Sequence, residues 1–235
     1  GQAGGQHDHY LDGLAYHGDL TLRADGAEGD FYVLSEVRHS GGQLQYLGSG
    51  QTQNTSANTV TDGAELILDE SVRLVQNDTN NNTILFDTTG GLDGDGNPRF
   101  PEGANILIEG SVFGSDFGDG GTLQLNAGTR GEIRIEGDVG TVDALGKLEI
   151  LQAADVVIEG DLLVGTFVQH AGQGNTTLGT DSTSSVQVTD NPSAGDPEAF
   201  EVTTTNSLTV KGDFSVTQGN AKVTLDPTAN AGKVH

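Results

Sequence analysis

The fold is decided by one short phrase, which occurs as Ile135-Glu136-Gly137-Asp138-Val139 and, 23 residues later, as Ile158-Glu159-Gly160-Asp161-Leu162. The same pattern occurs again as Ile108-Glu109-Gly110-Ser111-Val112, Val210-Lys211-Gly212-Asp213-Phe214, Tyr16-His17-Gly18-Asp19-Leu20 and, with Glu in place of Gly, Leu68-Asp69-Glu70-Ser71-Val72. The central positions are 18, 70, 110, 137, 160 and 212. Their separations indicate a repeat of about 23–27 residues, with one unit eroded in each long gap.

A second phrase has the same period. It occurs as Thr122-Leu123-Gln124-Leu125, Lys147-Leu148-Glu149-Ile150, Ala199-Phe200-Glu201-Val202 and Lys222-Val223-Thr224-Leu225. Apolar residues alternate with polar ones within both phrases, which predicts short strands with one face in a core and the other in water. Two independent phrases with one period therefore predict a repeat protein built from strands.

Short strands at a fixed period, with Gly at equivalent corners, predict an all-β fold: a parallel β-helix, or β-solenoid. About nine turns stacked at about 4.8 Å would give a rod about 45 Å long. The Gly residues at 110, 137, 160 and 212 are expected at corners, and Ile108, Ile135, Ile158 and Val210 in the core. A β-sandwich also has many short strands, but it does not need the same corner phrase in every unit.

The domain organisation follows from where the pattern breaks. Residues 1–15 are predicted as a polar N-terminal segment, and residues 16–235 as the solenoid. Polar insertions are expected as loops near 50–63, 87–103 and 180–198, because solenoid corners tolerate insertions. The chain starts Gly1-Gln2 and contains no Met, so we expect a processed form or a piece of a longer protein.

Composition excludes several classes of protein. There are 34 acidic and 10 basic residues, a net charge of −24, which argues against nucleic-acid binding and anionic membranes. No apolar run is long enough to span a membrane, so no membrane insertion is expected. The chain has no cysteine, which excludes disulfides and thiolate chemistry.

The strongest candidate metal site is the loop Asp93-Gly94-Asp95-Gly96-Asn97. Alternating oxygen side chains separated by Gly can wrap a hard cation, so Asp93, Asp95 and Asn97 are candidate calcium ligands. The alternative is a solvated acidic turn, for which Asp-Gly is an ordinary choice. The pair Asp116 and Asp119 is a weaker version of the same pattern.

Other candidates carry less chemistry. His7, His9 and His17 could chelate zinc or copper, or belong to a flexible polar end. Asn-x-Ser/Thr sequons occur at Asn54, Asn77, Asn81 and Asn175, as expected in so Asn- and Thr-rich a chain. Glu136 and Glu159 alternate with core residues, so they are expected as a solvated row of acids. The absence of Trp and of a G-x-S-x-G motif argues against an enzyme.

The segment from Gly121 to Gly179 carries a family resemblance. It contains Thr122-Leu-Gln-Leu-Asn-Ala-Gly128, Glu132-Ile-Arg-Ile-Glu-Gly-Asp-Val-Gly140, Lys147-Leu-Glu-Ile-Leu-Gln-Ala-Ala-Asp-Val-Val-Ile-Glu-Gly160 and Phe167-Val-Gln-His-Ala-Gly-Gln-Gly-Asn-Thr-Thr-Leu-Gly179. This order resembles the repeats of bacterial surface proteins of the filamentous-haemagglutinin-like and autotransporter-passenger-like type. The resemblance implies a right-handed parallel β-helix, secretion to the cell surface, and adhesion or scaffolding.

The expected function is an extracellular structural or adhesive β-solenoid, a segment or subunit of a bacterial cell-surface fibre or filament. Expected partners are copies stacked end to end, or neighbouring segments of a longer chain. One alternative is a host- or glycan-binding module that contacts a surface glycan or protein. A polysaccharide-degrading enzyme on the same fold is a further alternative.

Overall fold

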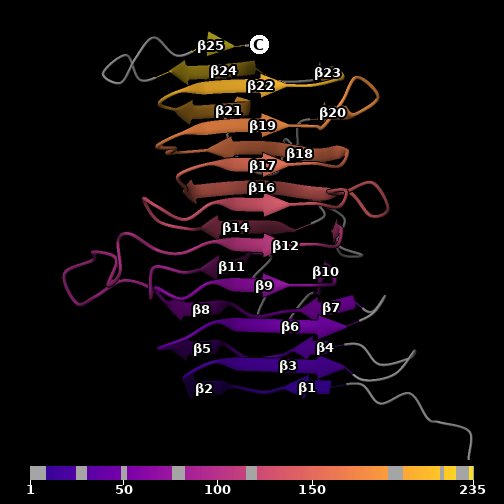
Figure 1. The fold of residues 1–235 in the computed structure, drawn as a ribbon. Helices are drawn as coiled ribbons and strands as arrows, with labels where there is room; N and C mark the ends of the chain where they lie inside the picture. The colour runs from indigo at the N-terminus through magenta and orange to yellow at the C-terminus, as the bar shows by residue number, and fades with distance from the viewer. Residues whose placement is uncertain are drawn as a thin grey trace, which may run out of the picture.

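Alternating inward and outward residues fold this chain into three parallel β-sheets that stack along one axis (Figure 1). The computed structural model describes residues 9–24, 31–48, 52–75, 83–114, 121–189, 198–217, 220–225 and 233–234. Every strand pair within these ranges is parallel. The predicted all-β parallel solenoid is therefore confirmed.

The third sheet is the most regular of the three. It contains nine strands, which are β3 (Leu20–Ala24), β6 (Leu44–Gly48), β9 (Leu66–Leu68), β12 (Ile106–Ile108), β15 (Ile133–Ile135), β17 (Val156–Ile158), β19 (Asn175–Leu178), β22 (Ser207–Val210) and β25 (Lys233–Val234). Each strand belongs to one turn of the solenoid, and we number these turns coil 1 to coil 9. The nine coils agree with the number of turns that the repeat predicts.

The other two sheets complete each coil. The first contains β1 (His9–Leu11), β4 (Phe31–Val33), β7 (Thr52–Thr55), β10 (Ser71–Leu74) and β13 (Val112–Phe113). The second contains β2 (Leu14–His17), β5 (Val37–Ser40), β8 (Thr59–Asp62), β11 (Thr83–Asp87), β14 (Thr122–Asn126), β16 (Leu145–Gln152), β18 (Leu162–Gln169), β20 (Ser185–Val188), β21 (Glu198–Thr204), β23 (Asp213–Val216) and β24 (Asn220–Leu225).

Strand β18 joins the first two sheets. Its first half pairs with β20 and its second half with β21. Single bridges from Val112 to Val139 and from Val139 to Leu162 continue the first sheet into β18. All three faces therefore extend from coil 1 to coil 9.

The repeated phrase marks the corner between the third and first sheets. Ile108, Ile135 and Ile158 occupy one register position, and all three are fully buried, as predicted. Leu68 and Val210 occupy the same position in their coils. The copy at Tyr16–Leu20 is the exception, because it lies between β2 and β3, at the corner between the second and third sheets. The prediction that this copy marks the same corner as the others was therefore wrong.

The glycines of this corner are required by close approach of neighbouring coils. A Cβ at Gly137 would lie 2.5 Å from the carbonyl carbon of Gly110, and one at Gly110 would lie 2.4 Å from the Ser71 nitrogen. A Cβ at Gly160 would lie 2.6 Å from the Gly137 carbonyl carbon. Of the four, only Gly212 also has a positive φ, of 83°. The repeated glycine thus lets backbones stack, and does more than permit a bend.

The spacing of the coils is less uniform than the predicted 23–27 residues. Partners on the third sheet are 27 residues apart from Ile106 to Ile133 and 23 from Ile133 to Val156. They are 20 apart from Val156 to Thr176 and 40 from Leu66 to Ile106. In the second phrase, Val202 pairs with Val223, so the copy at 222–225 is shifted by two residues. A shift of two keeps the same residues facing inward.

Two of the expected insertions contain strands. Residues 52–55 and 59–62 form β7 and β8, whose Gln53 and Thr59 side chains are fully buried. Residues 185–188 form β20, with Val186 and Val188 buried. Likewise β1 and β2 begin within the expected polar segment 1–15. Polar composition hid β7 and β8, because threonine and glutamine point inward there. Residues 88–105 leave the solenoid between β11 and β12, close to the predicted insertion 87–103.

Candidate functional site

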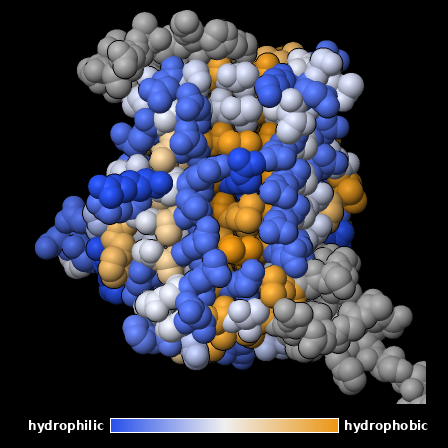
Figure 2. All heavy atoms as spheres, viewed as in Figure 1, coloured by the Kyte–Doolittle hydropathy of each residue, from blue (hydrophilic) through white to orange (hydrophobic). Residues whose placement is uncertain are grey.

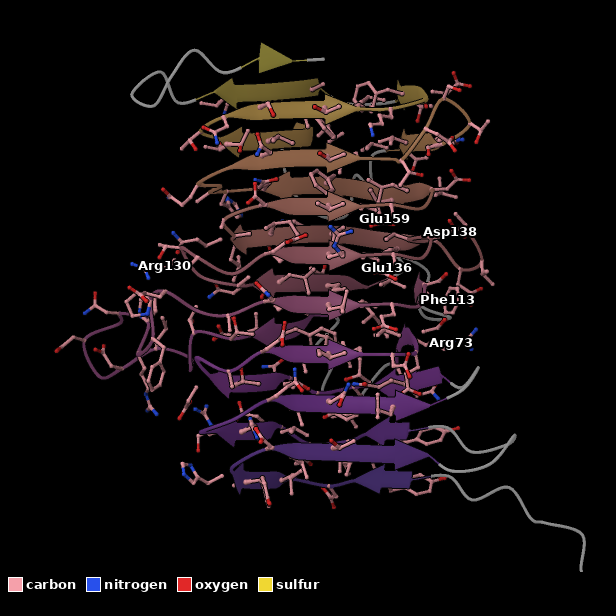
Figure 3. The ribbon with its side chains drawn as sticks, in the orientation of Figure 1. Arg73, Phe113, Arg130, Glu136, Asp138 and Glu159 are labelled. Carbon is pink, nitrogen blue, oxygen red and sulfur yellow. The ribbon has the colours of Figure 1, made fainter. Side chains whose placement is uncertain are left out.

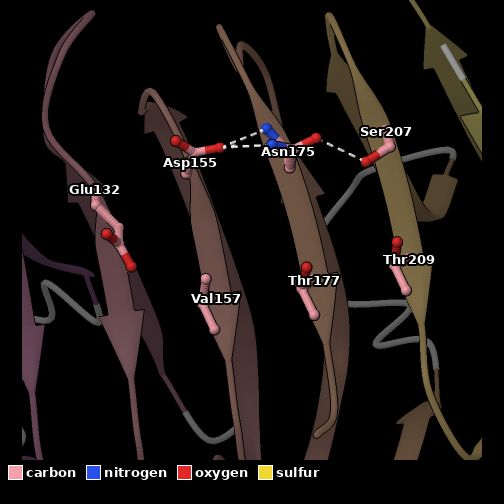
Figure 4. Close-up of a pocket in the computed structure, with 7 residues that line it drawn as sticks. All are labelled: Glu132, Asp155, Val157, Asn175, Thr177, Ser207 and Thr209. Carbon is pink, nitrogen blue, oxygen red and sulfur yellow. Dashed lines mark hydrogen bonds between the residues drawn. The ribbon is translucent and has the colours of Figure 1, made fainter.

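A groove on the outer face of the third sheet is the clearest candidate binding site. Its volume is about 520 Å³, and it spans coils 5 to 8 (Figure 4). It is lined by Glu132, Asp155, Val157, Asn175, Thr177, Ser207 and Thr209. Parallel pairing places Val157, Thr177 and Thr209 in one row on successive strands. These residues form the floor, and the remaining four form one rim.

Hydrogen bonds between coils fix the polar rim of the groove. The Asp155 Oδ1 atom accepts bonds from the Asn175 backbone N–H at 2.7 Å and from Asn175 Nδ2 at 3.2 Å. The Ser207 hydroxyl donates to Asn175 Oδ1 at 2.8 Å. The rim is therefore a relay of oriented donors and acceptors above a floor of hydroxyl and methyl groups. Such a surface suits a ligand with several hydroxyl or amide groups.

The groove continues a pattern on the outer face of the third sheet that begins at coil 3. Figure 2 shows an apolar strip along the rod axis between two hydrophilic columns. The outward residues Ile67, Leu107, Arg134 and Val157 follow one another in register. Arg134 bridges the columns, since its Nε donates to Glu132 at 3.1 Å and its Nη1 pairs with Glu159. One basic side chain thus ties the two acidic margins together.

One of these margins is a row of carboxylates on successive coils. Asp69, Glu109, Glu136 and Glu159 each follow a third-sheet strand, and Figure 3 shows Glu136 and Glu159 one above the other. A hydrogen bond with Asp69 raises the pKa of Glu109, and partial burial and the charges of Asp69 and Glu136 raise it further. Glu136 is exposed, as its alternation predicts. Glu159 is half-buried beneath its ion pair.

A separate polar cluster lies on the outer face of the second sheet around Glu149. The Glu149 carboxylate accepts from Gln124 Nε2 at 2.6 Å, and lies 3.0 Å from Lys147 Nζ and 2.8 Å from His170 Nε2. Burial alone would raise the pKa of Glu149, but the bonds from His170, Gln124 and Lys147 outweigh it, so the pKa is lowered. Sequence reasoning missed this cluster, because only strand register brings residues 124, 149 and 170 together.

The predicted calcium loop is a well-defined exposed turn. Asp93 Oδ1 accepts the backbone N–H groups of Asp95 and Asn97, both at 2.9 Å. These two bonds lower the pKa of Asp93. One carboxylate oxygen of Asp93 is therefore already used to shape the turn, while the side chains of Asp95 and Asn97 are exposed. The calcium site stays a prediction, which titration of Ca²⁺ into the parent and Asp93→Asn chains would test.

The loop that contains this turn is held at its start by Asp87, which the sequence analysis did not single out. Asp87 is 2% exposed, and its carboxylate accepts bonds from the Thr89 backbone N–H, the Thr89 hydroxyl and the Gly91 N–H. The signal was present, since Asp followed by Thr-Thr-Gly-Gly is typical of a turn closed by a side-chain oxygen. Arg130 Nη2 adds an ion pair to Glu102 at 3.2 Å, beside the insertion (Figure 3).

The other residues predicted as metal ligands or glycosylation sites do not form a common site within the described residues. His17 Nδ1 lies 3.1 Å from Ser40 Oγ, while His7 lies outside the described residues and the structure describes only the backbone of His9. Asp116, Asp119, Asn77 and Asn81 also lie outside them. Of the two sequons that are described, Asn54 is buried and Asn175 belongs to the groove.

The described residues lack two features. They contain no group of three or more His, Asp or Glu side chains placed to hold a metal ion. They also contain no helix long and apolar enough to cross a membrane. In comparisons with known proteins, the sequence matches no protein-family model, no curated protein and no solved structure.

Proposed function

We propose that this chain is a section or subunit of an extracellular cell-surface fibre, in which the solenoid is a stiff structural or adhesive rod. The observation that carries the proposal is the stacking of nine coils, which the third sheet joins strand to strand by parallel pairing. Among the described strands, those of coil 1 and coil 9 pair with a neighbour on one side only. A coil can therefore be added at either end of the stack without changing its geometry.

The charge distribution supports a rod that stays separate from its neighbours. The net charge is −24, and acidic side chains form rows along the third sheet. Like-charged rows on two rods that lie side by side repel each other, whereas the backbone edges at the ends stay available for pairing. The surface thus favours growth along the axis over lateral aggregation.

The location is tested by labelling cells. An antibody raised against the purified chain should label intact, unpermeabilised producing cells, and electron microscopy should place the label on surface fibres. Labelling that appears only after lysis would contradict the extracellular part of the proposal. An antibody that does not recognise this chain is the control for non-specific attachment.

The groove supports a second candidate, a glycan- or protein-binding module. Its relay of Asp155, Asn175 and Ser207 beside two threonines offers the oriented polar groups that sugars need. Binding of neutral and acidic oligosaccharides should fall in a Thr177→Val, Ser207→Ala double variant. Thr21→Val, at the same row position in coil 1, is the matched control. Equal binding by all three chains would remove this candidate.

The enzymatic alternative has one feature in its favour. Glu149 and His170 form a carboxylate–imidazole pair, which is the arrangement of a general base and its orienting acid. Incubation with acidic and neutral polysaccharides tests it, and a His170→Gln chain is the control. Product formation by the parent alone would favour an enzyme over a rod.

A further inference from the structure

The outer face of the third sheet is acidic and apolar in coils 3 to 6 and rich in hydroxyl groups in coils 7 and 8. Strands β9, β12, β15 and β17 each have one outward residue at the centre, and further outward residues lie directly before and after the strand. In coils 7 and 8 the centre residues are Thr177 and Thr209, and the flanking positions carry no acid. We call the outward surface of coils 3 to 6 the acid-edged strip. Its floor is Ile67, Leu107, Arg134 and Val157, and its margins are Glu65, Asn105, Glu132 and Asp155 on one side and Asp69, Glu109, Glu136 and Glu159 on the other.

The acid-edged strip carries seven carboxylates against one guanidinium. Within the described part of the chain, Asp69, Glu109 and Glu136 form no ion pair with a basic side chain. The hydrogen bond with Asp69, partial burial and the neighbouring acidic charges raise the pKa of Glu109. A cation between the margins would therefore gain attraction and relieve repulsion between the acids.

The floor of the strip is apolar except at Arg134. Ile67, Leu107 and Val157 are half-buried, and they belong to the apolar strip that Figure 2 shows between two hydrophilic columns. Covering their exposed area with hydrocarbon is favourable. A ligand that fits this surface therefore combines positive charge with methylene groups, as arginine and lysine side chains do.

Arg134 shows how such a side chain lies on the strip. Its Nε donates to Glu132 of the same coil at 3.1 Å, and its Nη1 pairs with Glu159 of the next coil. A guanidinium can hold two carboxylates at once, because its N–H groups form a planar fork.

The equivalent pair of acids around Ile67 is Glu65 of the same coil and Glu109 of the next coil. Here the floor residue supplies no cation. The Glu65 carboxylate is held in place by the side-chain amides of Gln43 and Asn105, which donate to it at 2.8 and 3.2 Å. Each of its oxygens keeps acceptor capacity for a further donor. Coil 3 thus repeats the surroundings of Arg134 without the arginine.

We propose that the acid-edged strip binds an extended arginine-rich segment of a partner protein. Its arginines take, in coils 3 and 4, the place that Arg134 takes in coil 5, and their methylene stems cover Ile67 and Leu107. Three arginines at alternate positions of an extended segment span about 13 Å, and coils 3 to 6 span about 14 Å. A rod needs no occupant on this face, so the strip adds a partner to the proposed function and does not rest on it.

Binding of a labelled peptide tests the margins. The probe is Arg-Ser-Arg-Ser-Arg-Ser with both ends blocked, and fluorescence anisotropy measures its Kd for the full chain. An Asp69→Asn, Glu109→Gln, Glu136→Gln triple variant should raise Kd at least about tenfold. The control triple variant Glu36→Gln, Asp95→Asn, Asp213→Asn removes equal charge elsewhere, and should change Kd by less than about twofold. An equal rise in both would overturn the proposal.

Two floor variants should act in opposite directions. Arg134→Val frees Glu132 and Glu159 for the peptide, and should lower Kd about threefold or more. Leu107→Arg fills coil 4 from within, and should raise Kd about tenfold. Arg99→Val makes the same charge change as Arg134→Val on the exposed insertion, and should leave Kd unchanged. All three side chains face outward, so thermal melting should show that each variant folds. Weaker binding by Arg134→Val would overturn the proposal.

Further probes decide the occupant and its place. The Thr177→Val, Ser207→Ala double variant should bind the peptide like the parent, because the segment lies on coils 3 to 6. A peptide with lysine in place of arginine should bind less tightly, because an ammonium group lacks the planar fork. Calcium or spermidine that binds as tightly as the arginine peptide would overturn the proposal in favour of small cations. Surface labelling judges the proposed fibre independently.

Discussion

Coils 3 and 6 share one backbone path but enclose different cores. Coil 3 points Gln53, Thr55, Thr59 and Thr61 inward, all fully buried, before the apolar Leu66 and Leu68. Coil 6 points inward only aliphatic residues, which are Val139, Leu145, Leu148, Ile150, Val156 and Ile158. The parallel ladder is therefore compatible with either core. Backbone pairing sets the shape of the coil, and side chains set how stable each coil is.

The polar core carries costs that the apolar core does not. Neither amide atom of Gln53 has a hydrogen-bond partner among the described residues, and Thr55 bonds only locally, to the Ala57 carbonyl at 2.9 Å. Burial raises the pKa of the nearby Tyr46 hydroxyl far above its ordinary value, and the charge of Glu70 adds to the shift. We therefore expect coils 2 to 4 to open before coils 5 to 8.

The largest expected effect comes from a charge in the apolar core. Ile158→Asp buries a carboxylate where the side chain is fully buried, and should cost more than about 4 kcal/mol, enough to unfold coils 5 to 8. The matched control is Val157→Asp, on the same strand but facing outward. Amide hydrogen exchange, compared coil by coil, measures the stability of both variants. Protection unchanged by Ile158→Asp would contradict the observed register.

The next largest effect is expected from the backbone at the corner between the third and first sheets. Gly137→Ala places a Cβ 2.5 Å from the Gly110 carbonyl carbon, and should destabilise by about 2–4 kcal/mol. Gly94→Ala is the control, since nothing lies within 4 Å of its Cβ position. Coil 4 has Glu70 at the equivalent position, so the clash is specific to the stacked glycines. Equal melting of the two variants would refute close stacking as the reason for the repeat.

Reciprocal exchange between the two cores should have opposite signs. Gln53 in coil 3 and Leu162 in the apolar core of coil 7 occupy one row, since Gln53 pairs with Val72, Val72 with Val112, and single bridges lead through Val139 to Leu162. Gln53→Leu should stabilise by about 1 kcal/mol, because it removes two unpaired amide atoms. Leu162→Gln should destabilise by about 3 kcal/mol. Thermal melting measures both, and destabilisation by both would mean that Gln53 is well accommodated.

The same contrast explains what the sequence could predict. The apolar coils could be predicted, because each of their third-sheet strands has apolar residues at alternate positions, as in Ile133-Arg134-Ile135, and is followed by the repeated corner phrase. In coil 3 only Leu68 was recognised, because the inward threonines and Gln53 of β7 and β8 have the composition of a polar loop. The groove and the Glu149 cluster depend on register between residues 20 to 32 positions apart, and variable loops between coils conceal it. The Asp93 turn could be predicted from the sequence, because its hydrogen bonds join residues only two to four positions apart.

The smallest effect lies where the two regions meet, in the carboxylate row at Glu109. The pKa of Glu109 is raised in the folded chain, so the folded state holds its proton more tightly than the unfolded state. Ionised Glu109 therefore opposes folding above its folded pKa, and the penalty disappears as pH falls towards the ordinary value. Glu109→Gln should raise Tm by about 1 °C at pH 7 and leave it unchanged near pH 4. Asp95→Asn, on the exposed turn, is the control for lost charge. A gain that persists at pH 4 would instead assign the effect to packing of the amide.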